Sequence, residues 1–65
     1  MMMAAFKDRN FAEKFGLSVK DTGVVLANET RDGEAFLTVQ FETVEVNGLP
    51  AELFTVSDQP EEGVE

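Results

Sequence analysis

The sequence predicts a small α+β domain in which an N-terminal helical segment packs on a three-stranded antiparallel β-meander. The first observation behind this prediction is the run 35–46, which is rich in β-branched and aromatic side chains, as central strands are. The second is that this run lies between Asp32-Gly33 and Asn47-Gly48, two dipeptides that favour the positive φ angles of hairpin turns. Three consecutive strands joined by two tight turns follow from these two observations.

The length and composition of the chain limit it to one thin core. A chain of 65 residues buries only about 60% of its unfolded surface, so we expect a single α+β domain over residues 1–57. Helix is expected within 4–20 and sheet within 22–57, whereas 58–65 has turn formers and four carboxylates and is expected to form a flexible acidic tail. The chain contains no cysteine and no histidine, so we expect no disulfide, metal site or cofactor.

The apolar stretch at the N-terminus is short. Residues 1–5 are all apolar, but five residues are too few for a signal-peptide core or a membrane span. We therefore expect a soluble protein that stays in the cytoplasm.

The helical signal is clearest from Asn10 onward. Asn10 and Glu13 have the spacing of a capping box, in which both side chains satisfy free backbone N–H groups at a helix start. Gly16 either ends this helix as a C-cap or is tolerated inside it at a cost of about 1 kcal/mol. A helix from residue 11 places one apolar stripe toward the sheet, formed by Phe11, Ala12, Phe15 and Val19.

The three strands are expected at about 22–30, 35–46 and 49–57. Hairpins closed at the two turn dipeptides predict the same register, since both direct the same face of the central strand to the core. Pro50 lacks an N–H group and suits an outer strand. The predicted core face carries two apolar rows with Leu37 beside them, Val24-Phe41-Phe54 and Leu26-Val39-Val56.

The opposite face of the predicted sheet is mixed rather than polar. Phe36, Val25 and Leu53 lie on it, at positions where a solvated face would have polar residues. One interpretation is that they are scattered surface residues, covered in part by the methionines and Phe6. The other is a dry protein-binding face, as an assembly adaptor of a phage particle would use.

The charge is strongly negative and unevenly distributed. Five basic residues oppose thirteen acidic ones, a net charge of −8. Residues 1–20 contain four basic and two acidic residues, whereas residues 21–65 contain Arg31 and eleven carboxylates. Such a field either keeps a small protein soluble or attracts basic proteins, and it repels nucleic acid and membranes.

Two stretches of the sequence resemble known functional motifs in part. Residues 12–22 resemble a helix-turn-helix pattern at Ala12, Gly16, Leu17 and Ser18, but the pattern departs at Thr22 and the stretch has few basic residues. A small DNA-binding regulator remains the alternative function on this ground. Residues 28–33 match half of a calcium loop, yet its twelfth position is Val39 where a glutamate is required. No pair of carboxylates stands out as a catalytic acid and base, so we expect no enzymatic activity.

A small, acidic, cysteine-free α+β domain with an acidic sheet and tail resembles the phage-encoded anti-CRISPR proteins that imitate DNA. The resemblance covers the whole chain in size, charge and architecture, and it rests on no residue string. It implies a monomer in the host bacterial cytoplasm, which blocks target-DNA binding by a type I CRISPR interference complex. Its partner would be a basic DNA-binding surface of one subunit, with no direct contact to nucleic acid or membrane.

The candidate partner-binding residues are outward carboxylates of the predicted sheet. Alternate side chains of a strand lie about 7 Å apart, the order of the phosphate repeat of a single nucleic-acid strand. The candidates form two groups, with Glu29, Asp32 and Glu34 at one end of the sheet and Glu42, Glu45 and Glu52 at the tip of the second hairpin.

Overall fold

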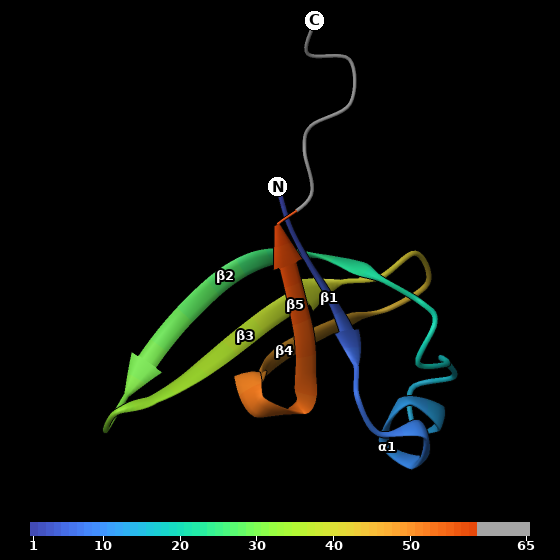
Figure 1. Ribbon diagram of the computed structural model, residues 1–65, viewed down its shortest axis with the longest axis horizontal. Coiled ribbons are helices and arrows are strands. Elements are labelled where there is room, and N and C mark those ends of the chain that lie inside the picture. Colours follow the sequence, from blue (N-terminus) through green and yellow to red (C-terminus); the bar gives the residue numbers. More distant parts are fainter. Residues whose placement is uncertain (59–65) are drawn as a thin grey trace, which may run out of the picture.

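A computed structural model describes residues 1–58 of the chain, so most of the expected acidic tail 58–65 lies outside the described residues. The described part is a five-stranded antiparallel sheet with one short α-helix and one 3-10 turn (Figure 1). In chain order the elements are β1 Met2–Phe6, α1 Arg9–Glu13, β2 Gly23–Arg31, β3 Glu34–Gln40, β4 Glu45–Pro50, η1 Ala51–Leu53 and β5 Phe54–Asp58.

The prediction of a helical segment on a three-stranded meander is wrong, because the N-terminal residues form a strand. The order of strands is β4-β3-β2-β1-β5, so β1 lies between β2 and β5. It pairs along its whole length with β5, from Met2 opposite Asp58 to Phe6 opposite Phe54. Methionine and alanine favour helices in isolation, and here strand pairing on both sides overrides that preference.

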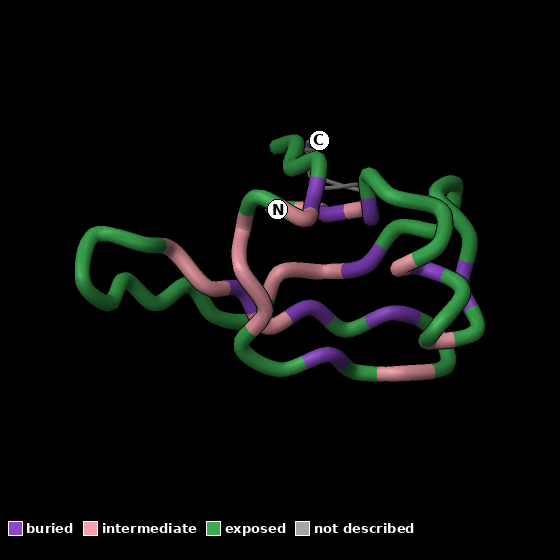
Figure 2. Tube along the Cα trace, turned by 90° about the horizontal axis from the view of Figure 1, so that it is seen from below, coloured by how far each residue is buried: buried purple, intermediate pink, exposed green. Residues whose placement is uncertain are grey.

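The sheet curls, because its two edges are joined by a very short connection. Strands β4 and β5 lie at opposite edges, yet only the three residues of η1 separate them in the chain. Three residues span at most roughly 11 Å, so the two edges must come close together. The Lys7 N–H donates to the carbonyl of Leu53 at 3.0 Å, which ties the end of β1 to η1. The hairpin of β2 and β3 projects from this curled body (Figures 1 and 2).

The first predicted turn is confirmed, and the register that it predicts holds only near the turn. Asp32 and Gly33 have φ angles of 52° and 78°, and Arg31 pairs with Glu34. Further along, the register shifts between residues 25 and 27. Leu26 is therefore not opposite a core residue, and its side chain is 56% exposed.

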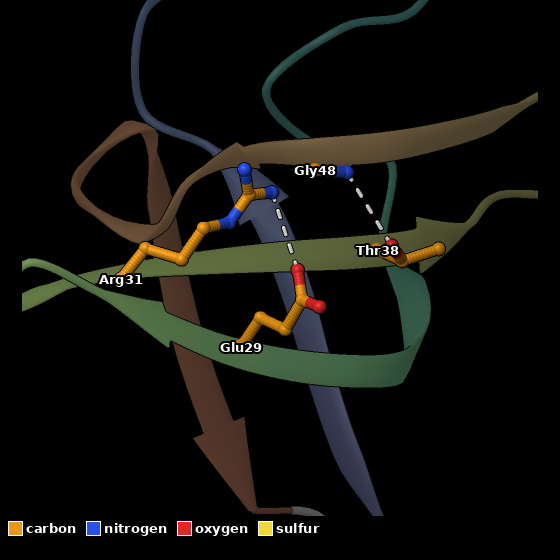
Figure 3. Close-up of polar contacts among 4 residues, drawn as sticks. All are labelled: Glu29, Arg31, Thr38 and Gly48. Atoms are coloured by element: carbon orange, nitrogen blue, oxygen red, sulfur yellow. Dashed lines mark hydrogen bonds and ion pairs between the residues drawn. The ribbon is translucent and has the colours of Figure 1, made fainter.

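The second predicted turn is wrong, because Asn47 and Gly48 lie inside β4. The chain reverses earlier, where the Phe41 N–H donates to the carbonyl of Val44 at 2.8 Å. Gly48 uses its positive φ of 63° for an irregularity in the pairing of β3 with β4. Its N–H donates to the hydroxyl of Thr38 at 3.3 Å (Figure 3). The predicted strands 35–46 and 49–57 therefore have the wrong bounds, because β3 ends at Gln40 and β4 runs from Glu45 to Pro50.

The core is built around the ring of Phe6, a residue to which the sequence assigns no clear place. Phe6 is 2% exposed, and its ring centroid lies 4.7 to 5.6 Å from those of four other phenylalanines. Those four residues are Phe11, Phe15, Phe41 and Phe54. Of the predicted core, Leu37, Val39, Phe41 and Phe54 are buried, whereas Leu26 and Val56 are exposed.

The α-helix within residues 1–58, α1, is shorter than predicted and begins before residue 11, the start that the capping signal predicts. Asp8 is its N-cap, and the carboxylate accepts a hydrogen bond of 3.1 Å from the N–H of Phe11, so the prediction of Asn10 as the cap is wrong. Gly16 has a φ of 75° in the turn after the helix. Of the two predicted alternatives, this residue therefore helps to end the helix and does not lie inside it. Val19 lies beyond the helix and is 38% exposed, so it is not part of the packing stripe.

Candidate protein-binding site

The carboxylates of residues 1–58 are all exposed and mostly unneutralised. Ten of the thirteen acidic residues lie in this described part, and each is exposed. Within it, ion pairs join Asp58 to the N-terminal ammonium of Met1 and Glu29 to Arg31. Both pairs lie at the surface, where salt screens them and their contribution to stability is small. The excess negative charge of residues 1–58 therefore lies on the accessible surface.

The structure brings the first predicted group together on the projecting hairpin, residues 27–36, which we call the arm. Glu29 lies on β2, Asp32 in the turn and Glu34 at the start of β3. Arg31 lies among them, with its Nη2 at 3.2 Å from the Glu29 Oε1 (Figure 3) and its guanidinium 5.1 Å from the ring centroid of Phe36. The arm thus carries three carboxylates and one guanidinium, a net charge of −2.

The second predicted group is only partly brought together. Glu42 lies in the turn that follows β3, and Glu45 is the first residue of β4. Glu52 lies in η1, beyond the other end of β4. The length of β4 separates it from Glu45, since the five steps from Glu45 to Pro50 amount to about 17 Å. The expected cluster at a hairpin tip does not exist, because Asn47-Gly48 is not the turn. We call Glu42 and Glu45 the turn pair.

Sequence reasoning missed a neighbour of the turn pair, Asp21. Asp21 and Glu42 line the same small hollow of about 190 Å³. The Asp21 carboxylate also accepts a hydrogen bond of 2.9 Å from the N–H of Ser18, which fixes the loop before β2. Nothing in the spacing of these residues along the chain could have indicated that they share a hollow.

A larger and mostly apolar hollow of about 440 Å³ lies where β2 separates from the pair of β1 and β5. Four of its lining side chains are among the exposed large apolar residues, with Leu26 56%, Met1 52%, Met2 44% and Val56 37% exposed. We call it the apolar hollow, and its lining consists of Met1, Met2, Val25, Leu26, Ala27, Asn28, Leu37, Ala51 and Val56. Sequence reasoning missed it because alternation assigned Leu26 and Val56 to the core, and the bulge has no sequence signal here.

The apolar face predicted from Phe36, Val25 and Leu53 is not formed. Val25 pairs with Val39 and packs against the core, and Leu53 also packs against the core. Phe36 is half-buried and lies under the guanidinium of Arg31. The three side chains therefore do not share one accessible surface, and an adaptor function would need a different one.

The helix-turn-helix pattern has no structural counterpart either. Within residues 1–58, α1 is the one α-helix, and it is five residues long. Residues 17–22, the second half of the stretch that resembles the pattern, form turns and an irregular loop. A helix that reads DNA is missing from this stretch, because Gly16 helps to end α1 and the loop 17–22 then leads to β2.

In residues 1–58 no three histidine, cysteine or acidic side chains converge in a way that could hold a metal ion. No helix of that range has the length and apolar character to cross a bilayer. Comparisons of this chain with protein-family models, with curated proteins and with solved structures found no match.

Proposed function

We propose that this protein binds a basic surface of another protein and competes there with nucleic acid. The observation that carries the proposal is the set of exposed carboxylates on the arm and at the turn pair, few of which have a cation beside them within residues 1–58. A surface of this kind attracts lysine-rich and arginine-rich surfaces and repels phosphate. The behaviour is that of the small acidic anti-CRISPR proteins which the chain resembles in size and charge.

The spacing of the two groups supports imitation of a nucleic-acid strand. Glu34 and Glu42 are eight residues apart along and just beyond β3, about 26 Å at the rise of a strand. Phosphates of one strand in a DNA duplex recur about every 3.4 Å along the duplex axis, so both groups together span the axial length of roughly eight base pairs. Charges that far apart are screened from each other beyond about 8 Å at physiological salt, so each group makes its own contact.

The partner we propose is the DNA-binding surface of a type I CRISPR interference complex in the bacterial cytoplasm, with one copy of this chain acting as a monomer. The test is a gel-shift assay of such a complex on its target DNA, with increasing amounts of this protein. We expect the shift to be lost at low salt, and the concentration of this protein that is needed for half-inhibition to rise with salt over the range in which the complex alone still shifts the DNA, because the contact is electrostatic. The protein alone should leave the DNA unshifted.

Two outcomes would contradict the proposal. One is a direct and saturable shift of DNA by this protein at physiological salt, which would mean that it binds nucleic acid itself. The other is inhibition that does not change with salt, which would place the contact on an apolar surface.

A further inference from the structure

One edge of β2 lacks a partner strand over most of its length. The strand has nine residues, and β1 pairs only with Gly23 and Val24 at its beginning. From residue 25 to Arg31, no other strand of the described range pairs with β2 on the side away from β3. An open edge of this kind is a template for another strand.

The backbone groups that this edge offers follow from the turn. Arg31 and Glu34 flank a two-residue turn and therefore exchange hydrogen bonds with each other. In an antiparallel ladder this pattern alternates, so Glu29 also directs its N–H and carbonyl toward β3. Asn28 and Thr30 then direct theirs outward, where a further strand would receive them.

The apolar hollow lies beside this edge, on one face of the sheet. Asn28 pairs with Leu37, and both residues line the hollow, so their side chains share that face. The opposite face of the arm carries the Glu29 carboxylate, because successive side chains of a strand alternate. A strand added about 4.8 Å from β2 would therefore meet an apolar face on one side and a charged face on the other, where Glu29 and Glu34 outnumber the guanidinium of Arg31.

We propose that the outer edge of β2 and the apolar hollow together bind an extended segment of a partner protein, in which apolar residues alternate with lysine or arginine. The segment adds to β2 as an antiparallel strand. Its apolar side chains enter the hollow, and its basic side chains lie on the face that carries Glu29 on the neighbouring strand β2 and Glu34 one strand further, on β3. This proposal does not depend on competition with nucleic acid.

Charge complementarity selects this occupant over a second copy of the chain. Each copy carries a net charge of −8, so two copies that met at their arms would repel each other. Asp58, which is paired to the Met1 ammonium at the hollow, adds a further carboxylate near its rim. Carboxylates thus lie both along the edge and beside the hollow, where Glu29 is paired with Arg31 and Asp58 with the Met1 ammonium, and the net charge of the arm is still −2.

The edge can be tested with a substitution that removes only an outward donor. The probe is a fluorescent peptide of alternating lysine and valine, and its anisotropy is followed with the full chain. Thr30→Pro deletes an N–H that points away from β3, which an edge strand tolerates, and should weaken binding about tenfold or more. Thr30→Val keeps that N–H and should bind within about twofold of the wild type. Circular dichroism confirms that both variants fold.

The hollow can be tested with matched exposed residues. Leu26→Ser removes a lining side chain and should weaken binding of the same peptide about fivefold or more. Val19→Ser removes an exposed apolar side chain that is not among the lining, and should leave binding unchanged. A peptide of alternating glutamate and valine should not bind.

Several results would overturn the proposal. One is the absence of binding to the lysine–valine peptide at millimolar concentration, and another is equal binding by Thr30→Pro and Thr30→Val. A dimer in sedimentation that Thr30→Pro dissociates would mean that a second copy occupies the edge. A tenfold gain in peptide affinity on Val64→Ser would mean that residues 59–65 of the chain itself occupy the hollow.

Discussion

The arm, residues 27–36, and the rest of the described chain, which we call the body, are stabilised by different interactions. The body has nine buried apolar residues, with the Phe6 ring at the centre of five phenylalanines. In the arm, residues 27–34 are exposed, and the hairpin depends on backbone pairing, a tight turn and one surface ion pair (Figure 2). The contrast implies that stability resides in the body, and that the arm can carry charge and an open edge at little cost to folding.

The largest effect is expected from Phe6→Ala, which removes the centre of the body. The side chain is 2% exposed and stacks on three rings, and truncation of a buried phenylalanine costs about 3–5 kcal/mol. The free energy of unfolding of so small a domain is only a few kcal/mol, so the variant should be largely unfolded at 25 °C. Thermal and urea melts followed by circular dichroism measure this.

The control for Phe6→Ala is Phe36→Ala on the arm, where the ring is half-buried and contacts a guanidinium. Phe36→Ala should lower the free energy of unfolding much less than Phe6→Ala does. Equal losses of unfolding free energy in the two variants would mean that the arm is as important to stability as the body.

A smaller effect is expected from Gly23→Ala, at the point where β1 and β2 pair. A Cβ at this position would lie 2.7 Å from the carbonyl oxygen of Gln40 and 2.7 Å from a methyl carbon of Val39. Overpacking of this kind typically costs about 1–3 kcal/mol. Urea denaturation should show a lower midpoint with an unchanged slope. A midpoint equal to that of the wild type would show that the body has room here.

The arm could be predicted from the sequence more fully than the body. Asp32-Gly33 acts locally, and its preference for positive φ is enough to set the pairing of Arg31 with Glu34. Asn47-Gly48 has the same local preference, but the tertiary structure uses it inside β4. A turn signal states which backbone angles a dipeptide tolerates, and not which element contains it.

The body could not be predicted because it depends on contacts between distant residues. Strand β1 has weak strand preference, and it forms because β2 and β5 pair with it from both sides. The bulge at Leu26 moves an apolar side chain from the expected core to the surface. The same cause applies to the candidate sites. The carboxylates of the arm were grouped correctly through one local turn, whereas the apolar hollow depends on the bulge and on β1.

Two glycines test whether the arm opens separately from the body. Gly33 in the arm turn and Gly16 after α1 have φ angles of 78° and 75°, and neither has an atom within 4 Å of an added Cβ. The backbone cost of alanine is therefore the same at both, about 1 kcal/mol. Gly16→Ala should lower the unfolding free energy by that amount. Gly33→Ala should lower it less, because the exposed arm can open without exposing the core.

Hydrogen exchange separates the two explanations for a small effect of Gly33→Ala. If the arm opens locally, amides of residues 27–36 should exchange faster in this variant, whereas those of β1 and β5 should not change. Faster exchange throughout the chain would mean that arm and body unfold together, and the distinction between them would fail.

The smallest effect on stability, and the sharpest on function, is expected from charge neutralisation. Glu29→Gln with Glu34→Gln on the arm, and Glu42→Gln with Glu45→Gln at the turn pair, each change the net charge from −8 to −6. All four residues are exposed, so the free energy of unfolding of both double variants should lie within about 0.5 kcal/mol of that of the wild type. Each should compete less well with DNA for a basic partner.

The arm variant should lose more of this competition than the turn variant. Arg31 remains on the arm, so its local charge falls from −2 to zero, whereas Asp21 remains beside the turn pair as a further carboxylate. Because the two groups are separated by about three screening lengths, their losses should add in the four-residue variant. Gel-shift competition at two salt concentrations measures each loss. If all three variants inhibit as the wild type does while Leu26→Ser fails, then the apolar hollow carries the function and the acidic surface only keeps the protein soluble.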